Sequence, residues 1–211
     1  MARGRRKVED PATARRILTA AENQFAAQGL AGARTEEIAT AAHANKAMLY
    51  YYFGSKHRLH RAVLANLFRQ FRARVLAPPN PSLSPREKFF AHVSNYFDFL
   101  ATHPNYPRIV QREAMGASRN FDWIVREHLR PLHRLLAQAI EKGIAVGEFR
   151  EVDVDQVAQI SLGMAVSYFA AVEILSQVVA RDLLAPQAVA ARKRAVLDFL
   201  DHALAPEGAN S

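Results

Sequence analysis

Hydrophobic residues recur along the chain at the three- and four-residue spacing of amphipathic helices, and no stretch shows the sustained alternation of a half-buried strand. Glycine and proline fall at the ends of the periodic segments. The pattern predicts an all-α chain of about nine helices without a sheet. The predicted helices span residues 11–28, 35–42, 46–53, 56–76, 85–102, 105–115, 120–142, 154–180 and 186–205.

Local signals mark several of the predicted helix ends. Asp10-Pro11 is an N-cap followed by proline at the first helical position, and the stretch from Ser84 to Glu87 has the form of a capping box. Gly29 can adopt the left-handed conformation that ends a helix. Residues 77–81 form the clearest break in the chain, and residues 143–151 are predicted to form a loop.

The short predicted helix 46–53 is unusual because it ends in four consecutive aromatic residues, with Lys46 before them and Lys56 after them. It follows another short helix after the tight turn His43-Ala44-Asn45. Two short helices joined in this way, after a longer one, predict a helix-turn-helix. In that motif the second short helix enters the DNA major groove.

Helix geometry separates the side chains of this segment by face. Leu49 and Phe53 lie four residues apart and share an inner face that packs on the two preceding helices. The outer positions, which can contact DNA, are Lys46, Ala47, Tyr50 and Tyr51. A helix that serves only hydrophobic packing, with its tyrosines half-buried, is the alternative that the pattern leaves open.

Excess positive charge is confined to the first third of the chain. Residues 1–75 hold 14 Lys/Arg and 5 Asp/Glu, a balance of +9, whereas residues 76–211 hold 14 and 15, a balance of −1. This segregation indicates a polyanionic partner for the N-terminal third. A basic surface that serves only solubility is the alternative.

Residues 14–64 closely resemble the DNA-binding segment of the TetR family of one-component transcriptional regulators. The resemblance is carried by the stretches RILTAAENQFAAQGL, TEEIATAA and NKAMLYYYFGSKHRL. The remainder matches in architecture only, as an all-helical effector domain that ends in two apolar helices. The resemblance implies a cytoplasmic homodimer that binds a palindromic double-stranded DNA operator, usually as a repressor released by a small-molecule effector.

By position, the resemblance also implies which residues meet the operator. Thr35 would touch the DNA backbone at the start of the second helix, and Lys56 would reach a phosphate. Tyr50 and Tyr51 would contact the backbone. Base or phosphate contacts are implied for Asn45, Lys46, Ala47 and Met48.

Two positions depart from the family pattern. His43 stands where the family usually has glycine in the turn, and a positive φ there would cost about 1 kcal/mol or a little more. Ala47-Met48 stand where the family often has Gly-Thr. Met48 lacks the threonine's hydrogen bond, which leaves it an apolar contact with a thymine methyl group.

A basic arm precedes the first helix and can lie in a minor groove or along phosphates. We expect DNA contacts from Arg3, Arg5 and Arg6 in the complex, whereas a solvated tail is the alternative for the free protein. The predicted division is a DNA-binding domain at 1–56, with the arm at 1–9, and an effector-binding and dimerisation domain at 57–211.

The last two predicted helices have more apolar surface than a monomer of this size is expected to bury. Apolar residues go almost round the helix 154–180, and Val196, Leu197 and Leu200 form a stripe on the next. A two-fold four-helix interface would place two recognition helices about 34–36 Å apart. Burial in one large core is the alternative. Segment 154–180 could also span a bilayer, but its Asp, Glu and Gln residues predict a buried helix of a soluble protein.

The middle of the chain combines aromatic and polar residues in the way that a small-molecule site does. Plain core packing is the alternative for each residue, and only the family resemblance favours a pocket, for an effector of unspecified identity. The predicted lining comprises Phe89, His92, Tyr96, Phe99, Arg112, Glu113, Trp123, His128, Met164 and Tyr168.

No metal site, cofactor or catalytic centre is predicted. The pairs His57 with His60 and His128 with His133 lack a third ligand at a suitable offset, so solvated imidazoles are expected. The sequence contains no cysteine, nucleophile elbow or Gly-rich phosphate loop.

The sequence leaves two rival functions open. The first is an architectural DNA-binding protein without an effector. The second is an all-helical enzyme that acts on an acidic substrate, for which Glu113 beside Arg112 is the only faint candidate pair.

Overall fold

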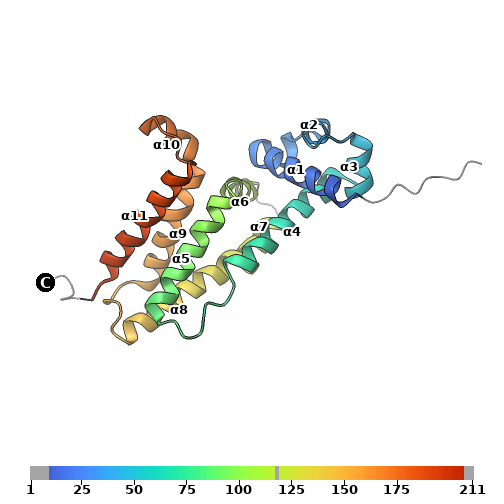
Figure 1. The fold of residues 1–211 in the computed structure, drawn as a ribbon. Helices are drawn as coiled ribbons and strands as arrows, with labels where there is room; N and C mark the ends of the chain where they lie inside the picture. The colour runs from blue at the N-terminus through green and yellow to red at the C-terminus, as the bar shows by residue number, and fades with distance from the viewer. Residues whose placement is uncertain (1–9, 117–118, 207–211) are drawn as a thin grey trace, which may run out of the picture. The chain divides into compact units, whose positions relative to one another are not determined.

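The structure is a computed structural model that describes residues 10–116 and 119–206. Within these ranges every regular element is a helix, as predicted (Figure 1). The elements are α1 (Pro11–Gly32), α2 (Thr35–Ala41), α3 (Lys46–Phe53), α4 (Lys56–Arg74), α5 (Pro85–Thr102), α6 (Tyr106–Met115), α7 (Arg119–Ile124), the π-helical turn η1 (Val125–Leu129), α8 (Arg130–Ala145), α9 (Val154–Ala170), α10 (Val172–Val179) and α11 (Pro186–Leu204).

The chain divides into two compact units, Met1–Leu67 and Phe68–Ser211. The boundary falls within α4, so the first unit contains α1, α2, α3 and most of α4. The second unit contains the remaining helices. The functional domains expected at 1–56 and 57–211 stay a prediction.

The first unit begins with the predicted cap. Asp10 Oδ1 accepts a hydrogen bond from the Ala12 amide at 2.9 Å, which satisfies one of the free amides at the start of α1. Gly29 has φ 69° and interrupts the regular helix, although a last turn continues to Gly32. The apolar faces of the helices meet in a small core. Its fully buried members include Ile17, Ala21, Phe25, Ile38, Leu49 and Leu59.

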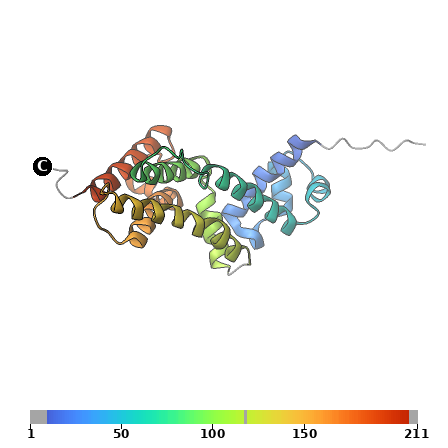
Figure 2. The same ribbon diagram turned by 90° about the horizontal axis from the view of Figure 1, so that it is seen from below.

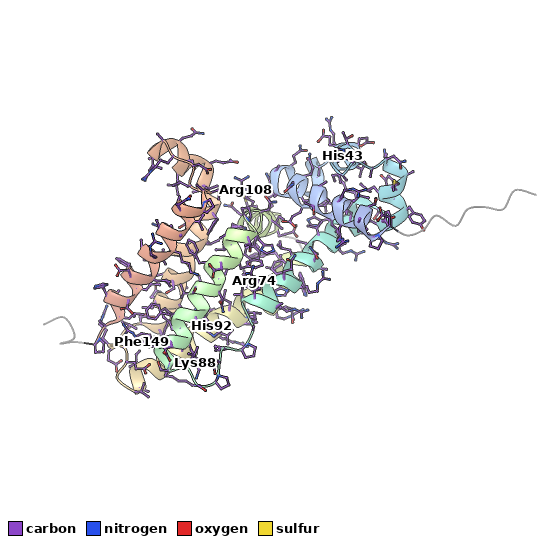
Figure 3. The ribbon with its side chains drawn as sticks, viewed as in Figure 1. His43, Arg74, Lys88, His92, Arg108 and Phe149 are labelled. Carbon is purple, nitrogen blue, oxygen red and sulfur yellow. The ribbon has the colours of Figure 1, made fainter. Side chains whose placement is uncertain are left out.

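The turn between α2 and α3 is formed around His43 (Figure 3). His43 has φ 49°, so the positive φ considered for this position is present. The His43 amide donates to the Thr40 carbonyl at 3.0 Å, and the Ala44 amide donates to the Ala39 carbonyl at 2.9 Å. These bonds use the carbonyls at the end of α2 and start α3 after a short connection.

The second unit is built around α5, α8, α9 and α11, which lie side by side in both ribbon views (Figures 1 and 2). The predicted capping box opens α5. Ser84 Oγ accepts a hydrogen bond from the Glu87 amide at 3.3 Å, and Glu87 Oε2 accepts one from the Ser84 amide at 2.8 Å. Fully buried side chains between these helices include Phe89, Phe97, Leu136, Ile140, Phe169 and Leu200.

The segment predicted as a helix at 120–142 is helical throughout, but it is not one regular α-helix, because it contains a π-helical turn. α7 ends at Ile124, and η1 separates it from α8. Pro131 lies in the first turn of α8. Its ring nitrogen cannot donate to the carbonyl of Glu127, and a regular α-helix would bring the ring against that carbonyl. A wider turn before the proline is consistent with this constraint.

The loop predicted to start at Gly143 is also wrong, because α8 continues to Ala145. Gly143 is buried in the helix, and a Cβ atom there would lie 2.3 Å from Cδ2 of Phe149. The glycine therefore serves the close approach of the Phe149 ring. The chain turns at Gly147, which has φ 74°.

The single helix predicted at 154–180 is interrupted at Ala171. This residue has φ −104° and ψ 12°, and α9 and α10 are bent by 74°. The Tyr168 hydroxyl donates to the Leu183 carbonyl at 2.7 Å, and Arg108 Nη2 lies 2.8 Å from Glu173 Oε1. These tertiary contacts hold the bend, which periodicity alone cannot predict. The predicted cap at Asp153 is present, because its Oδ1 accepts from the Gln156 amide at 3.0 Å.

In the part of the chain that the structure describes, no single helix is long and apolar enough to cross a membrane. The pair α9 and α10 meets the length and composition requirement only when both are counted together across their bend.

Arg86 joins three segments of the second unit. Its Nη2 lies 2.5 Å from Asp201 Oδ1 on α11, and its Nη1 donates to the Glu148 carbonyl at 3.1 Å. Its guanidinium carbon lies 5.6 Å from the centre of the Phe149 ring. Phe149 marks the end of the unit where α5 begins, and Arg108 lies toward the opposite end (Figure 3).

Candidate nucleic-acid interface and ligand cavity

Helix α3 has one buried face and one exposed face. Leu49 is fully buried, and Phe53 is half-buried beside it. Tyr50 and Tyr51 are 42% and 58% exposed, which leaves both phenols accessible. Lys46 is exposed on the same outer surface. Because these groups can donate to phosphates or to base edges, the outer face of α3 can contact a duplex.

The start of α3 is capped by Asn45. Its Oδ1 accepts a hydrogen bond from the Met48 amide at 2.8 Å, although the residue is exposed. Ala47 is exposed and Met48 is half-buried at this end of the helix. The side-chain amide oxygen of Asn45 is therefore used as the N-cap of α3, which is a structural role in addition to the expected DNA contact.

Lys46 is paired with Glu36 of α2. The Lys46 ammonium group donates to Glu36 Oε1, and the Thr35 hydroxyl donates to Glu36 Oε2 at 3.2 Å. The hydrogen bond from Lys46 lowers the pKa of Glu36 to about 2. Both members of the ion pair are about half exposed, with side-chain exposures of 51% for Lys46 and 61% for Glu36. Thr35 itself is buried, so its contact with DNA would involve its backbone or a moved side chain.

Lys56 is directed at the end of α1. Its ammonium group donates to the carbonyls of Ala31 and Ala33, each at 3.2 Å. Two of its three donors thus satisfy carbonyls that the helix leaves free. The expected phosphate contact of Lys56 stays a prediction, and the structure adds a capping role.

Tyr52 lies at the inner edge of α3. The Asp10 amide donates to the Tyr52 hydroxyl at 3.1 Å, which joins α3 to the start of α1. The basic arm, with Arg3, Arg5 and Arg6, lies outside the described residues.

The second unit contains a cavity of about 390 Å³. Its walls come from α5, α6, η1, α8 and α9, and they are mostly aliphatic. The lining consists of Tyr96, Tyr106, Pro107, Val110, Gln111, Ala114, Leu129, Leu132, Leu162, Val166 and Ala170. The volume lies within the usual range of small-molecule sites.

Of the ten residues predicted to line a pocket, only Tyr96 lines this cavity. Phe89 and Phe99 are fully buried in the core, and the Tyr168 hydroxyl is bound to the Leu183 carbonyl. His92 lines a smaller hollow of about 240 Å³ beside Lys88. The other residues lie outside the lining: Arg112, Glu113, Trp123, His128 and Met164.

Four of the unpredicted lining residues share one signal in the sequence. Pro107, Val110, Gln111 and Ala114 follow the spacing of one face of α6, and a helix with such a face next to apolar neighbours can form a wall. Aromatic content does not identify this lining, because most large aromatic residues of this unit fill the core.

The prediction of solvated histidines is wrong for two of the four. His60 is 3% exposed and its ring meets the Phe25 ring edge-on at 4.8 Å. His128 is 1% exposed and stacks on Phe68 at 4.3 Å. Both lie on apolar helix faces, where tertiary packing buries them. His57 is exposed, and among the described residues no group of three His, Cys, Asp or Glu could hold a metal ion.

Glu113, the acidic member of the faint catalytic pair, is buried rather than on the surface. It is 8% exposed, and its Oε2 accepts a hydrogen bond from Asn120 Nδ2 at 2.9 Å. It joins α6 to α7, which is a structural role.

Two family models match the chain. The model described as "Bacterial regulatory proteins, tetR family" matches residues 17–63, which include α2, the turn and α3. The model described as "Tetracyclin repressor-like, C-terminal domain" matches residues 85–200, which include every residue of the cavity lining.

Two curated relatives are similar in sequence. The HTH-type transcriptional repressor NicS of Pseudomonas putida is 31% identical over 139 residues, which cover 64% of this chain and 65% of NicS. The HTH-type transcriptional repressor SCO4008 of Streptomyces coelicolor is 35% identical over 107 residues, which cover 50% of this chain and 52% of that protein. The chain therefore spans less than two thirds of each of these relatives.

Solved structures share the fold. A tetR-family regulatory protein from Rhodococcus RHA1 has a TM-score of 0.72 at 18% identity, with 92% of this chain and 97% of that chain covered. The ketosteroid transcriptional regulator KstR2 of Mycobacterium tuberculosis has a TM-score of 0.71 at 22% identity, with 95% and 98% covered. At such identities the likeness shows the fold alone.

Proposed function

We propose that the chain, which belongs to the tetR family of bacterial regulatory proteins, is a cytoplasmic DNA-binding transcriptional repressor that a small molecule releases from its operator. The observation that carries the proposal is the outer face of α3. Lys46, Tyr50 and Tyr51 are exposed on this face, while Leu49 on the opposite face of the same helix is fully buried.

In the proposed complex α3 enters the major groove. Lys46, at the first position of the helix, exchanges Glu36 for a guanine edge or a phosphate, while the two exposed tyrosines donate to the DNA backbone. Asn45 holds the start of α3, and Lys56 holds the end of α1. Arg3, Arg5 and Arg6 extend the contact along the duplex.

One copy of a short helix provides few contacts, so we propose that a homodimer binds a palindromic site. Exposed apolar side chains on α9, α10 and α11 support an interface there, with Ile160 49%, Ile174 68% and Phe199 58% exposed. Val196 and Leu200, expected on this surface, lie in the core of the unit instead. Two-fold symmetry would place the recognition helices about 34–36 Å apart.

Release would begin at the cavity of the second unit. α5 and α6 pack against the last turns of α4 there, because Tyr96 and Tyr106 contact Phe71. A ligand that shifts α4 would respace the two recognition helices and favour a conformation that does not fit the operator.

The test is a salt titration with a cognate site. The full-length protein is used to select binding sequences from a random pool of duplexes, and the affinity for the selected site is measured by fluorescence anisotropy at several salt concentrations. We expect a fall of log affinity with log salt of about 0.9 for each phosphate neutralised. A scrambled duplex of equal length and composition is the control.

The outcome separates the rival functions. Equal affinity for the selected and the scrambled duplex would favour an architectural DNA-binding protein. Absence of DNA binding even at low salt would overturn the proposal and favour the enzyme. The candidate acid of that enzyme, Glu113, already has its carboxylate bound by Asn120.

A further inference from the structure

We propose that the cavity of the second unit takes an uncharged, largely apolar molecule with a single hydrogen-bond acceptor, and that the phenols of Tyr96 and Tyr106 are the donors that bind this acceptor. The inference rests on the proposed function, because it specifies the chemistry of the effector.

The first support is the composition of the walls. Eight of the eleven lining residues are Pro, Val, Ala or Leu, and the polar side chains are Tyr96, Tyr106 and Gln111. No Lys, Arg, His, Asp or Glu belongs to the lining. A charged ligand would lose its hydration without gaining a counter-ion, which strongly disfavours carboxylates and ammonium groups.

The second support is an unused polar group. Tyr106 is 1% exposed, and its hydroxyl has no hydrogen-bond partner among the described residues. Buried hydroxyls normally have a partner, because leaving one unpaired costs free energy. An acceptor brought by the ligand would supply it.

The third support is the protonation state of the two phenols. Burial raises the pKa of Tyr106 well above its usual value, and the nearby Tyr96 raises it further. Burial also raises the pKa of Tyr96. Both phenols are protonated at neutral pH and can each donate a hydrogen bond, so a carbonyl or ether oxygen, which has two lone pairs, is the matching ligand group.

The same two rings contact α4. Tyr106 stacks on Phe71 with 5.4 Å between ring centres and 8° between planes, and Tyr96 meets Phe71 edge-on at 6.3 Å. Phe71 is fully buried. A ligand that draws the phenols toward its acceptor must move rings that pack directly on α4, so recognition and the shift of α4 involve the same side chains.

The test uses matched probes, because the natural effector is unidentified. The full-length protein is titrated with the neutral fluorophore N-phenyl-1-naphthylamine, whose emission rises in apolar surroundings. Butylbenzene, butyrophenone and 4-phenylbutyrate then compete for it. These three share one carbon skeleton and differ in having no acceptor, one neutral acceptor and a negative charge.

We expect butyrophenone to compete about threefold to tenfold better than butylbenzene, as one buried hydrogen bond allows, and 4-phenylbutyrate to compete worst. In the double variant Tyr96→Phe with Tyr106→Phe, butyrophenone should lose this advantage while butylbenzene is unchanged. Gln111→Leu is the matched control and should preserve the advantage. Val166→Trp fills the cavity and should abolish fluorophore binding.

Three results would overturn the inference. In the first, 4-phenylbutyrate is the best competitor. In the second, the advantage of butyrophenone over butylbenzene survives the loss of both phenols or disappears in Gln111→Leu. In the third, fluorophore binding persists in Val166→Trp or is absent from the wild-type protein. Operator affinity, measured separately without probes, distinguishes this failure from a failure of the proposed repressor function.

Discussion

Helix α3 of the first unit and helix α6 of the second each present a candidate binding face, and the two faces differ in how the sequence encodes them. The face of α3 is convex, polar and formed by consecutive turns of one helix, with Lys46, Tyr50 and Tyr51 exposed. The face of α6 is one wall of a cavity to which five elements contribute. A surface site can therefore be located from the periodicity of one segment, whereas a cavity depends on how distant segments pack.

The largest expected effect concerns α3. Lys46→Ala combined with Tyr50→Ala should lower operator affinity by about two orders of magnitude or more, because each lost contact costs about 1–3 kcal/mol and is lost in both protomers. Fluorescence anisotropy with the selected duplex measures the change. Arg134→Ala, an exposed position of the second unit, is the control and should leave affinity unaltered. A folded double variant that binds the operator as tightly as the wild type would show that the outer face of α3 is not the DNA-binding face.

The next effect tests whether the second unit depends on tertiary fit. Gly143→Ala should lower the free energy of unfolding by about 1–3 kcal/mol, because the new methyl group overlaps the Phe149 ring. Chemical denaturation followed by circular dichroism gives the value. In a Phe149→Leu background the further cost of the alanine should shrink. If Gly143→Ala lowered the free energy of unfolding equally in both backgrounds, the Phe149 ring would not be the cause.

A smaller effect concerns the pH dependence of the second unit. Burial is the main cause that lowers the pKa of His128 to about 4, and Arg72 adds to it. Because the imidazole has its ordinary pKa near 6.5 in the unfolded state and takes up the proton there first, the free energy of unfolding should fall as pH drops from 6.5 to 4, by up to about 3 kcal/mol.

The measurement is denaturant unfolding at several pH values within this window. His128→Phe keeps a ring on Phe68 and should flatten the profile. The free energy of unfolding of this variant should still fall slightly with decreasing pH, because burial also lowers the pKa of His92. An unchanged profile in the variant would mean that His128 does not stay neutral in the folded state.

The smallest effect refines the account of α3. Glu36→Gln removes the carboxylate that pairs with Lys46 in the free protein, so affinity for a scrambled duplex should rise by about twofold to fivefold, as for the loss of one exposed ion pair. Anisotropy at low and moderate salt measures it, with Glu37→Gln on the same helix as the comparison. A fall in affinity would instead show that Glu36 positions Lys46 for binding.

The elements that could be predicted are those that neighbouring residues determine, as for the face of α3. The caps at Asp10, Ser84 and Asp153 depend on neighbouring residues, and all three are present. The span of α3 matches its prediction for the same reason, since Asn45 and Gly54 bound it locally.

Elements that depend on distant contacts could not be predicted in this way. Gly143 resembles a helix end in sequence and is a contact site for Phe149 in the structure. The bend at Ala171 is held by contacts of Tyr168 and Glu173 with other segments. The cavity lining follows from such packing, and Tyr96 is the one residue of the predicted pocket that lines it.

The junction at Arg86 fixes the position of α11 against the start of α5. It binds the start of α5 to the end of α11 and to the loop after α8, whereas Tyr96, Val166 and Ala170 place the cavity along the later turns of α5 and α9. Lys193 Nζ of α11 lies 2.7 Å from Asp98 Oδ2, so a second ion pair joins α5 and α11 at these later turns. Because ion pairs tie both the first and the later turns of α5 to α11, expansion of the cavity would displace these two helices together.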